Sequence, residues 1–120
     1  MTLAQHADYK IRYQQQVDNA RQYVLPFIAQ TVPVSAALKV MDIGCGEGGV
    51  LIPFLELGCN TVGIELDELK SGYAKKLLAD YITSGQVEIV NQNIYEEAAL
   101  ERFSGQFDLI LLKDVIEHIP

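Results

Sequence analysis

The chain has 120 residues, of which 49% are hydrophobic and 21% charged, with a formal net charge of −7. This length supports one small domain with a single core and not two. The acidic balance disfavours a nucleic-acid partner, which needs a basic face. No apolar run approaches the roughly 20 residues that span a bilayer, and residues 1–10 lack the order of a signal peptide.

Apolar spacing predicts helices alternating with strands. A helix is expected over residues 8–31, with a kink at Pro26 and an apolar face that runs from Tyr9 to Phe27. Further helices are expected over 48–57, 67–78 and 96–103, and strands over 38–43, 60–65, 86–90 and 107–112. The alternation predicts a parallel α/β sheet with right-handed crossovers. The fourth strand is apolar almost throughout, which is typical of a strand covered on both faces.

The most informative segment runs from Val40 to Gly49, where a short apolar run ends in Asp42 and four glycines follow within six positions. Glycine tolerates positive φ and has no Cβ, so such a loop can bend sharply and let a ligand touch the backbone. A strand that enters a glycine-rich turn and then a helix is how open α/β sheets build a nucleotide site.

Ligands of such sheets bind outside the carboxyl ends of the strands. Glu65 ends the second strand 17 residues after Gly48, where a carboxylate can accept both hydroxyls of a ribose. After the third strand, Asn93 and the backbone of Ile94 can hydrogen-bond an adenine edge, or Asn93 can serve its own turn.

Four segments, in order, resemble the motifs of the class I S-adenosylmethionine-dependent methyltransferases. Residues 42–48 (DIGCGEG) are similar to the first motif, D-x-G-x-G-x-G, and residues 63–67 (GIELD) to the second. Residues 91–94 (NQNI) resemble the adenine-contacting segment, in which this family more often has Asp than Asn93. Residues 108–120 resemble the fourth motif, and their VIEHIP ending is typical of the ubiquinone- and menaquinone-type, small-molecule branch.

The resemblance covers residues 38–120, about two thirds of the chain. It implies a Rossmann-like, doubly wound sheet of strand order 3-2-1-4 after an N-terminal helix. We expect a single S-adenosylmethionine-binding domain, 1–120, with a helical cap over 1–34 and the core over 35–120. Because the family sheet has seven strands and four can be read here, we expect the chain to be truncated after the fourth motif.

The resemblance implies methyl transfer from S-adenosyl-L-methionine to a small-molecule acceptor, with S-adenosyl-L-homocysteine as product and no metal. His118 is a candidate general base, or a hydrogen-bonding element of the loop after the fourth strand. Asp42 and the carbonyls of Gly44 and Lys113 would take the ammonium group, and Leu66 would lie along the adenine. The full set of cofactor-binding residues that it implies is Asp42, Gly44, Cys45, Gly46, Gly48, Glu65, Leu66, Asn93, Ile94 and Lys113.

Two other interpretations stay open. Gly44, Gly46 and Gly49 also satisfy the G-x-G-x-x-G pattern of nicotinamide-dependent oxidoreductases, although a carboxylate at Asp42 would repel a pyrophosphate. Alternatively, the chain binds the cofactor without turnover and needs the missing half or a partner.

The sequence also leads to expectations about the oligomeric state and the cellular compartment of the protein. An uncovered fourth strand would favour self-association into a homo-oligomer. Cys45 and Cys59 are not placed for a disulfide, so we expect a reducing, cytoplasmic compartment.

Overall fold

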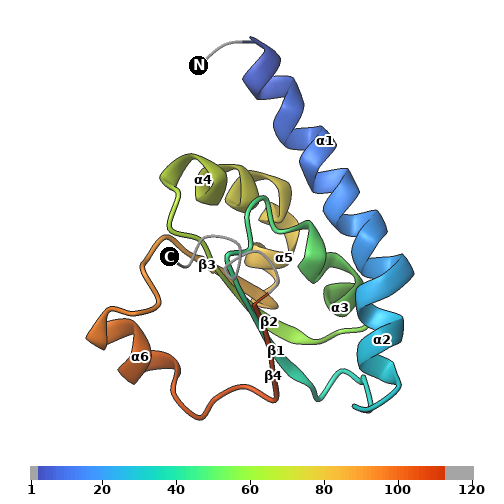
Figure 1. Cartoon of the computed structure of the whole chain (residues 1–120). Helices are drawn as coiled ribbons and strands as arrows, with labels where there is room; N and C mark the ends of the chain where they lie inside the picture. The colour runs from blue at the N-terminus through green and yellow to red at the C-terminus, as the bar shows by residue number, and fades with distance from the viewer. Residues whose placement is uncertain (1–2, 113–120) are drawn as a thin grey trace.

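The fold is a four-stranded parallel sheet whose successive strands are connected by helices (Figure 1). The computed structural model describes the backbone of residues 3–112 and the side chains of residues 8–112. The strand order is β3-β2-β1-β4, which confirms the predicted class and topology. The strands are β1 (Lys39–Ile43), β2 (Asn60–Ile64), β3 (Val87–Val90) and β4 (Leu109–Leu111). The helices are α1 (Leu3–Asn19), η1 (Ala20–Val24), α2 (Leu25–Ala29), η2 (Gly49–Leu51), α3 (Ile52–Glu56), α4 (Glu68–Leu77), α5 (Ala79–Thr83) and α6 (Glu97–Phe103).

The first helical segments, α1, η1 and α2, follow one another without a gap and form one long rod beside the sheet (Figure 1). Proline lacks an N–H and crowds the carbonyl four residues earlier, so Pro26 disturbs the regular helix. The turn before it is π-helical, and Leu25 N donates to Ala20 O, five residues back. The wider turn shifts the buried face by one residue: Leu25 and Ile28 pack against the core, whereas Phe27 is 70% exposed. The predicted burial of Phe27 is therefore wrong.

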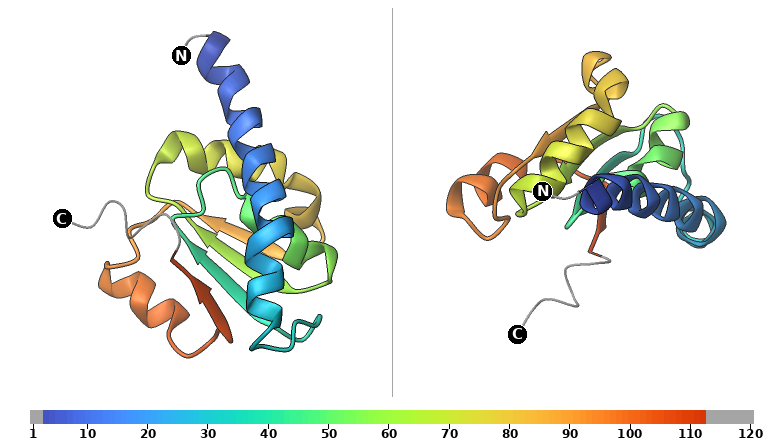
Figure 2. Two further views of the ribbon diagram at one scale, coloured as in Figure 1. Left: turned by 45° about the vertical axis from the view of Figure 1, so that its right-hand side comes forward. Right: turned by 90° about the horizontal axis from the view of Figure 1, so that it is seen from above.

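Side chains alternate between the two faces of the sheet, as the period of a strand requires. On one face Val40, Ile89 and Leu111 join a core formed with η1, η2, α3 and α4. On the other face Met41 and Ile64 pack against Phe103 of α6 and its neighbours. Figure 2 shows α6 in orange, apart from the other helices. Within the described residues, the second face is thus the more thinly covered.

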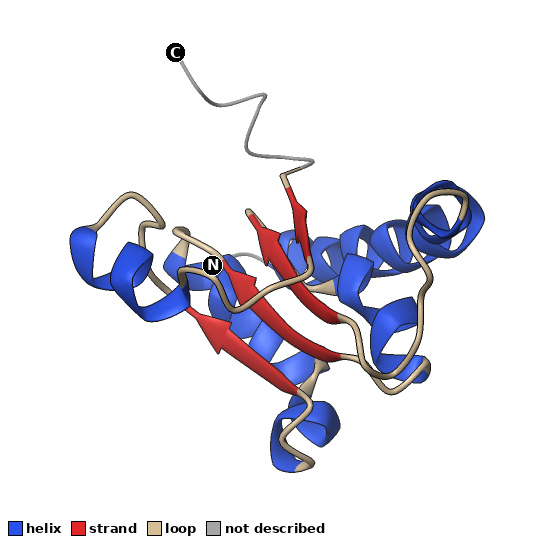
Figure 3. Ribbon diagram, turned by 90° about the horizontal axis from the view of Figure 1, so that it is seen from below, coloured by secondary structure: helices blue, strands red, loops and turns tan. Residues whose placement is uncertain are grey.

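The fourth strand is shorter and more exposed than predicted. It spans Leu109–Leu111 and pairs with β1 at the edge of the sheet, with Ile110 opposite Met41 (Figure 3). Ile110 is 52% exposed and Leu112 is 45% exposed. The expectation of cover on both faces is wrong for the described chain, because only the face that carries Leu111 has helices packed over it there.

The predicted helix over 67–78 is capped by Asp67, whose side chain accepts from the N–H groups of Leu69 and Lys70. The chain then continues as α5 after a break at Leu78. Cys45 and Cys59 are both free thiols, as expected. Among the described helices, none has the length and apolar character needed to cross a bilayer.

The glycine loop packs closely on the sheet at Gly63 of β2. A Cβ at this position would lie 2.9 Å from Cys45 Sγ and 3.0 Å from Ile89 Cδ1. We therefore expect Gly63→Ala to lower the free energy of unfolding by about 1–3 kcal/mol, the usual cost of overpacking. Urea denaturation followed by circular dichroism measures this change.

Gly72 of α4 is the matched control, since a Cβ there would meet no atom within 4 Å. Gly72→Ala should be neutral or stabilise the helix by roughly 0.5–1 kcal/mol. Equal stability of the Gly63→Ala variant and the parent chain would contradict the close packing of loop and strand.

Candidate functional site

The glycine-rich loop leaves the carboxyl end of β1 and bends over the end of β2. Gly44, Gly46 and Gly48 have φ values of 78°, 56° and 88°, which are strained for any residue with a Cβ. The N–H groups of Gly44 and Cys45 donate to the carbonyl of Ile64 at 2.8 and 3.0 Å. The first turn after β1 is therefore fastened to the last residue of β2.

The carboxylate of Glu65, directly after β2, joins this loop to the start of α4. Its Oε1 accepts from the N–H of Gly46 at 2.8 Å, and its Oε2 accepts from the N–H of Asp67 at 2.9 Å. Glu65 is only partly buried. An ionised carboxylate has about four acceptor positions, so these two bonds leave capacity for donors from a ligand.

The segment after β3 lies at the same end of the sheet and is hydrogen-bonded to the segment after β2. Asn91 Nδ2 donates to the carbonyls of Glu65 and Leu66, at 2.9 and 3.0 Å. Asn93 Oδ1 accepts from the N–H of Tyr95 at 3.0 Å, so Asn93 does serve its own turn, the alternative noted from the sequence. Asn93 and Ile94 are half-buried, and Leu66 is 67% exposed. The link through Asn91 was missed by sequence reasoning, although a polar residue that directly follows a strand is a usable signal.

Asp42 and Cys45 lie deep in the site, with exposed fractions of 3% and 2%. Burial raises the pKa of the Cys45 thiol well above its usual value, and the nearby carboxylates of Asp42 and Glu65 raise it further. The thiol therefore stays protonated at neutral pH, and its Sγ lies 3.8 Å from the carbonyl of Gly46. Of the other predicted site residues, Lys113 and His118 lie outside the described residues.

Helix α1 contacts the loop through the side chains of Arg12 and Gln16. Glu47 is 1% exposed, and its carboxylate accepts from Arg12 Nε and Gln16 Nε2, both at 3.0 Å. Gln16 Oε1 accepts from the N–H of Gly49 at 3.0 Å. Sequence reasoning missed these three side chains, because an Arg and a Gln on an amphipathic helix look like ordinary solvent-facing residues.

Two open hollows border the described fold. One, of about 560 Å³, lies at the start of α4 next to the Glu65 turn and is lined by Asp67, Glu68, Leu69, Gly72 and Tyr73. The Tyr73 ring also stacks on the Tyr9 ring of α1, with centroids 4.0 Å apart.

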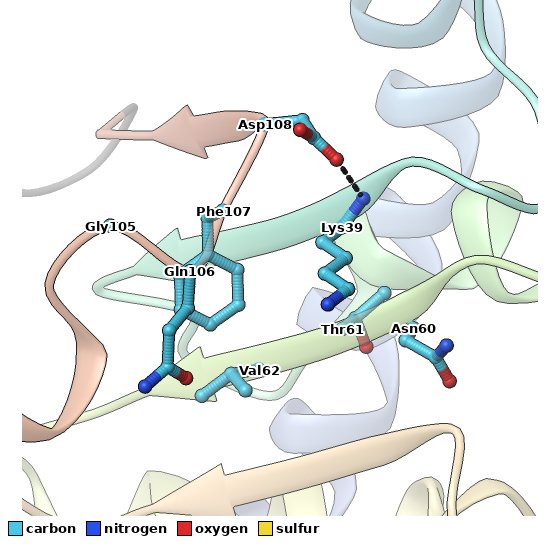
Figure 4. Close-up of a pocket in the computed structure, with 8 residues that line it drawn as sticks. All are labelled: Lys39, Asn60, Thr61, Val62, Gly105, Gln106, Phe107 and Asp108. Atoms are coloured by element: carbon cyan, nitrogen blue, oxygen red, sulfur yellow. Dashed lines mark hydrogen bonds between the residues drawn. The ribbon is translucent and has the colours of Figure 1, made fainter.

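The other hollow, of about 550 Å³, includes Lys39 and Asn60, the first residues of β1 and β2 (Figure 4). It therefore lies away from the carboxyl ends of these strands, where the sequence places the site.

The parallel sheet of order 3-2-1-4, with a glycine loop held by the acidic end of its second strand, is the arrangement of class I S-adenosylmethionine-dependent methyltransferases. The chain belongs to the family described as "Methyltransferase domain", whose model matches residues 10–120.

Curated relatives agree with this assignment. The chain is 32% identical over 96 residues to a ubiquinone biosynthesis O-methyltransferase of Leptothrix cholodnii, which covers 80% of this chain and 40% of that relative. It is 36% identical over 86 residues to the protein of the same name from Pseudomonas putida, which covers 71% and 35%. The chain thus spans about two fifths or less of the length of these relatives.

Solved structures show the same fold. PKMT2 from Rickettsia typhi, in complex with AdoHcy, superimposes with a TM-score of 0.53 at 31% identity, over 65% of this chain and 15% of that one. Magnesium protoporphyrin IX methyltransferase from Synechocystis, with bound SAH, gives a TM-score of 0.57 at 23% identity, over 92% and 45%. At that identity the second likeness concerns the fold alone.

The raised pKa of Cys45 leads to a testable expectation. Because only the thiolate reacts with alkylating agents and the folded thiol binds its proton more tightly, the native chain should label slowly at pH 8. Mass spectrometry after iodoacetamide treatment would locate the label, with the urea-unfolded chain as the control. Labelling of native Cys45 as fast as in urea would contradict its buried, protonated state.

Proposed function

We propose that the domain to which these residues belong binds S-adenosyl-L-methionine and transfers its methyl group to a small-molecule acceptor. The observation that carries the proposal is the contact of Glu65 with both Gly46 and Asp67, because it brings an acidic strand end against a glycine loop. The bound cofactor would supply a methyl group on a positively charged sulfonium. The protein's task is to hold and align the two reactants and to exclude water.

Glu65 would hold the ribose. Both of its oxygens already accept a backbone N–H, which fixes the direction of the carboxylate, and the remaining lone pairs suit two neighbouring hydroxyl donors. The backbone of Ile94 and the side-chain NH2 group of Asn93, whose oxygen already accepts from Tyr95, would meet the adenine edge, and Leu66 would lie along the ring. These roles agree with the exposed or half-buried state of the three residues.

The charge of the loop suits a cationic ligand. The carboxylates of Asp42 and Glu65 both raise the pKa of the Cys45 thiol, so negative charge lies close to this short segment, whereas Glu47 is paired with Arg12. Such surroundings favour a sulfonium and an ammonium group, and the ammonium group would be received by Asp42 and by the carbonyls of Gly44 and Lys113. They disfavour a pyrophosphate, so the chemistry of the loop supports a methyl donor rather than a nicotinamide dinucleotide.

The small-molecule acceptor is supported by the names of the relatives, which describe O-methyltransferases of ubiquinone biosynthesis. The proposed acceptor is accordingly a small molecule with a hydroxyl group. His118 keeps its two proposed roles, as a general base for that hydroxyl or as part of the loop that follows β4.

Replacing Glu65 tests the ribose contact. We expect Glu65→Ala to weaken binding of S-adenosylhomocysteine by about ten-fold or more, since a hydrogen bond to a charged group is worth about 1.5–3 kcal/mol. Isothermal titration calorimetry measures the Kd, with NAD as the competing ligand class and Glu101→Ala, on the exposed side of α6, as the control. An unchanged Kd in Glu65→Ala would remove Glu65 from this role, and tight binding of NAD would overturn the cofactor assignment.

A second candidate function is cofactor binding without turnover. It is favoured by the exposure of Ile110 and Leu112 at the sheet edge. The same edge is where we propose that two copies associate, because an uncovered apolar strand pairs readily.

A methyl-transfer assay beside size-exclusion chromatography separates the two candidates. If the second candidate holds, the 120-residue chain should bind S-adenosylhomocysteine, elute as a dimer or larger species, and transfer no methyl group to phenol-type acceptors. A monomer that turns over such an acceptor would contradict it and support a complete catalytic unit.

A further inference from the structure

We infer that Gln16 of α1 is a positioning residue for the cofactor: through Glu47 and Gly49 it holds the glycine loop in its binding shape. This inference rests on the proposed function, and it assigns to the first helix a task at the site in addition to its packing on the core. It arises from polar contacts that the ligand roles described above do not use.

The loop is anchored on two sides. On the β2 side, the carbonyl of Ile64 and the carboxylate of Glu65 accept N–H groups from its first half. On the α1 side, the single amide of Gln16 reaches two loop residues, since its Nε2 donates to Glu47 and its Oε1 accepts from the N–H of Gly49. A side-chain amide has both a donor and an acceptor end, so Gln16 can satisfy both groups at once.

Glu47 makes this contact obligatory. Its side chain is 2% exposed, and a buried carboxylate is costly unless it is hydrogen-bonded and paired with a cation. Arg12 supplies the cation and Gln16 the second donor. If α1 moved away, Glu47 would lose both partners, so the position of the helix and the shape of the loop are linked.

The backbones of helix and loop also approach closely. A Cβ at Gly49 would lie 2.4 Å from the carbonyl oxygen of Tyr13 and 2.6 Å from Gln16 Cβ. A Cβ at Gly46 would lie 3.1 Å from Gln16 Nε2. Gln16 therefore lies over both halves of the loop, and the glycines make room for α1 as well as for a ligand.

The consequence is a change in cofactor affinity without any contact to the cofactor. A loop that is only partly in its binding shape binds more weakly by the fraction of molecules that are competent. Loss of the Gln16 bridge should lower that fraction while the β2 anchors remain.

The test is an exchange of two side chains. Gln16→Glu places two carboxylates against each other and should weaken the Kd for S-adenosylhomocysteine by about ten-fold, which corresponds to about 1.4 kcal/mol. The double variant Gln16→Glu/Glu47→Gln again pairs one amide with one carboxylate, so its Kd should return to within about two-fold of the parent value. Gln15→Glu adds the same charge on an exposed neighbouring position of α1 and should stay within about two-fold as well.

Calorimetric titration gives each Kd, and a thermal melt by circular dichroism shows that each variant is folded at the titration temperature. Should Gln16→Glu fail to fold, Gln16→Met removes both hydrogen bonds without adding charge and should show the same loss of affinity. Parent-like affinity in the folded single variant would overturn the inference, and so would a loss that the double variant does not recover. Failure of the parent chain to bind S-adenosylhomocysteine would instead overturn the proposed function, and it is seen before any variant is made.

Discussion

The hydrogen bonds of the Glu65 carboxylate are the constraint on which the candidate site depends. They bind the middle of the glycine loop to the turn that starts α4, so Gly46, which lies 19 residues before Glu65, and Asp67 share one acceptor. Asn91 then ties the segment after β3 to the backbone of Glu65 and Leu66. Because parallel strands deliver their carboxyl ends to one edge of the sheet, three consecutive strand ends become a single surface.

The fold also shows an imbalance between the two faces of its sheet. One face is covered by α1, η2, α3 and α4, and Leu51, Phe54 and Leu78 are fully buried there. On the other face the described cover comes from α6 and the segment after it, where Phe103 and Phe107 pack on Met41 and Ile43. The exposed Ile110 follows from this imbalance.

The N-terminal rod contacts both the hydrophobic core and the glycine loop. Its apolar side packs into the core, and its polar side reaches the glycine loop through Arg12 and Gln16. The π-helical turn before Pro26 adjusts the rod between α1 and the sheet, so that Ile28 rather than Phe27 faces the core.

The resemblance to class I methyltransferases implied the strand order, whereas the sequence by itself determined the alternation of strands and helices and the chemistry of the strand ends. These follow from local features: the apolar period of each segment, the glycines that permit positive φ at positions 44, 46 and 48, and the acidic residue after the second strand. Only the tertiary structure decided that Glu47 is buried, that Gln16 bridges to Gly49, and that Phe27 points outward. The burial of Glu47 and the bond between Gln16 and Gly49 depend on the packing of α1 against a loop that is distant in the sequence. The exposure of Phe27 depends on a one-residue shift of the buried face within the helix. The spacing of residues along the chain predicts neither.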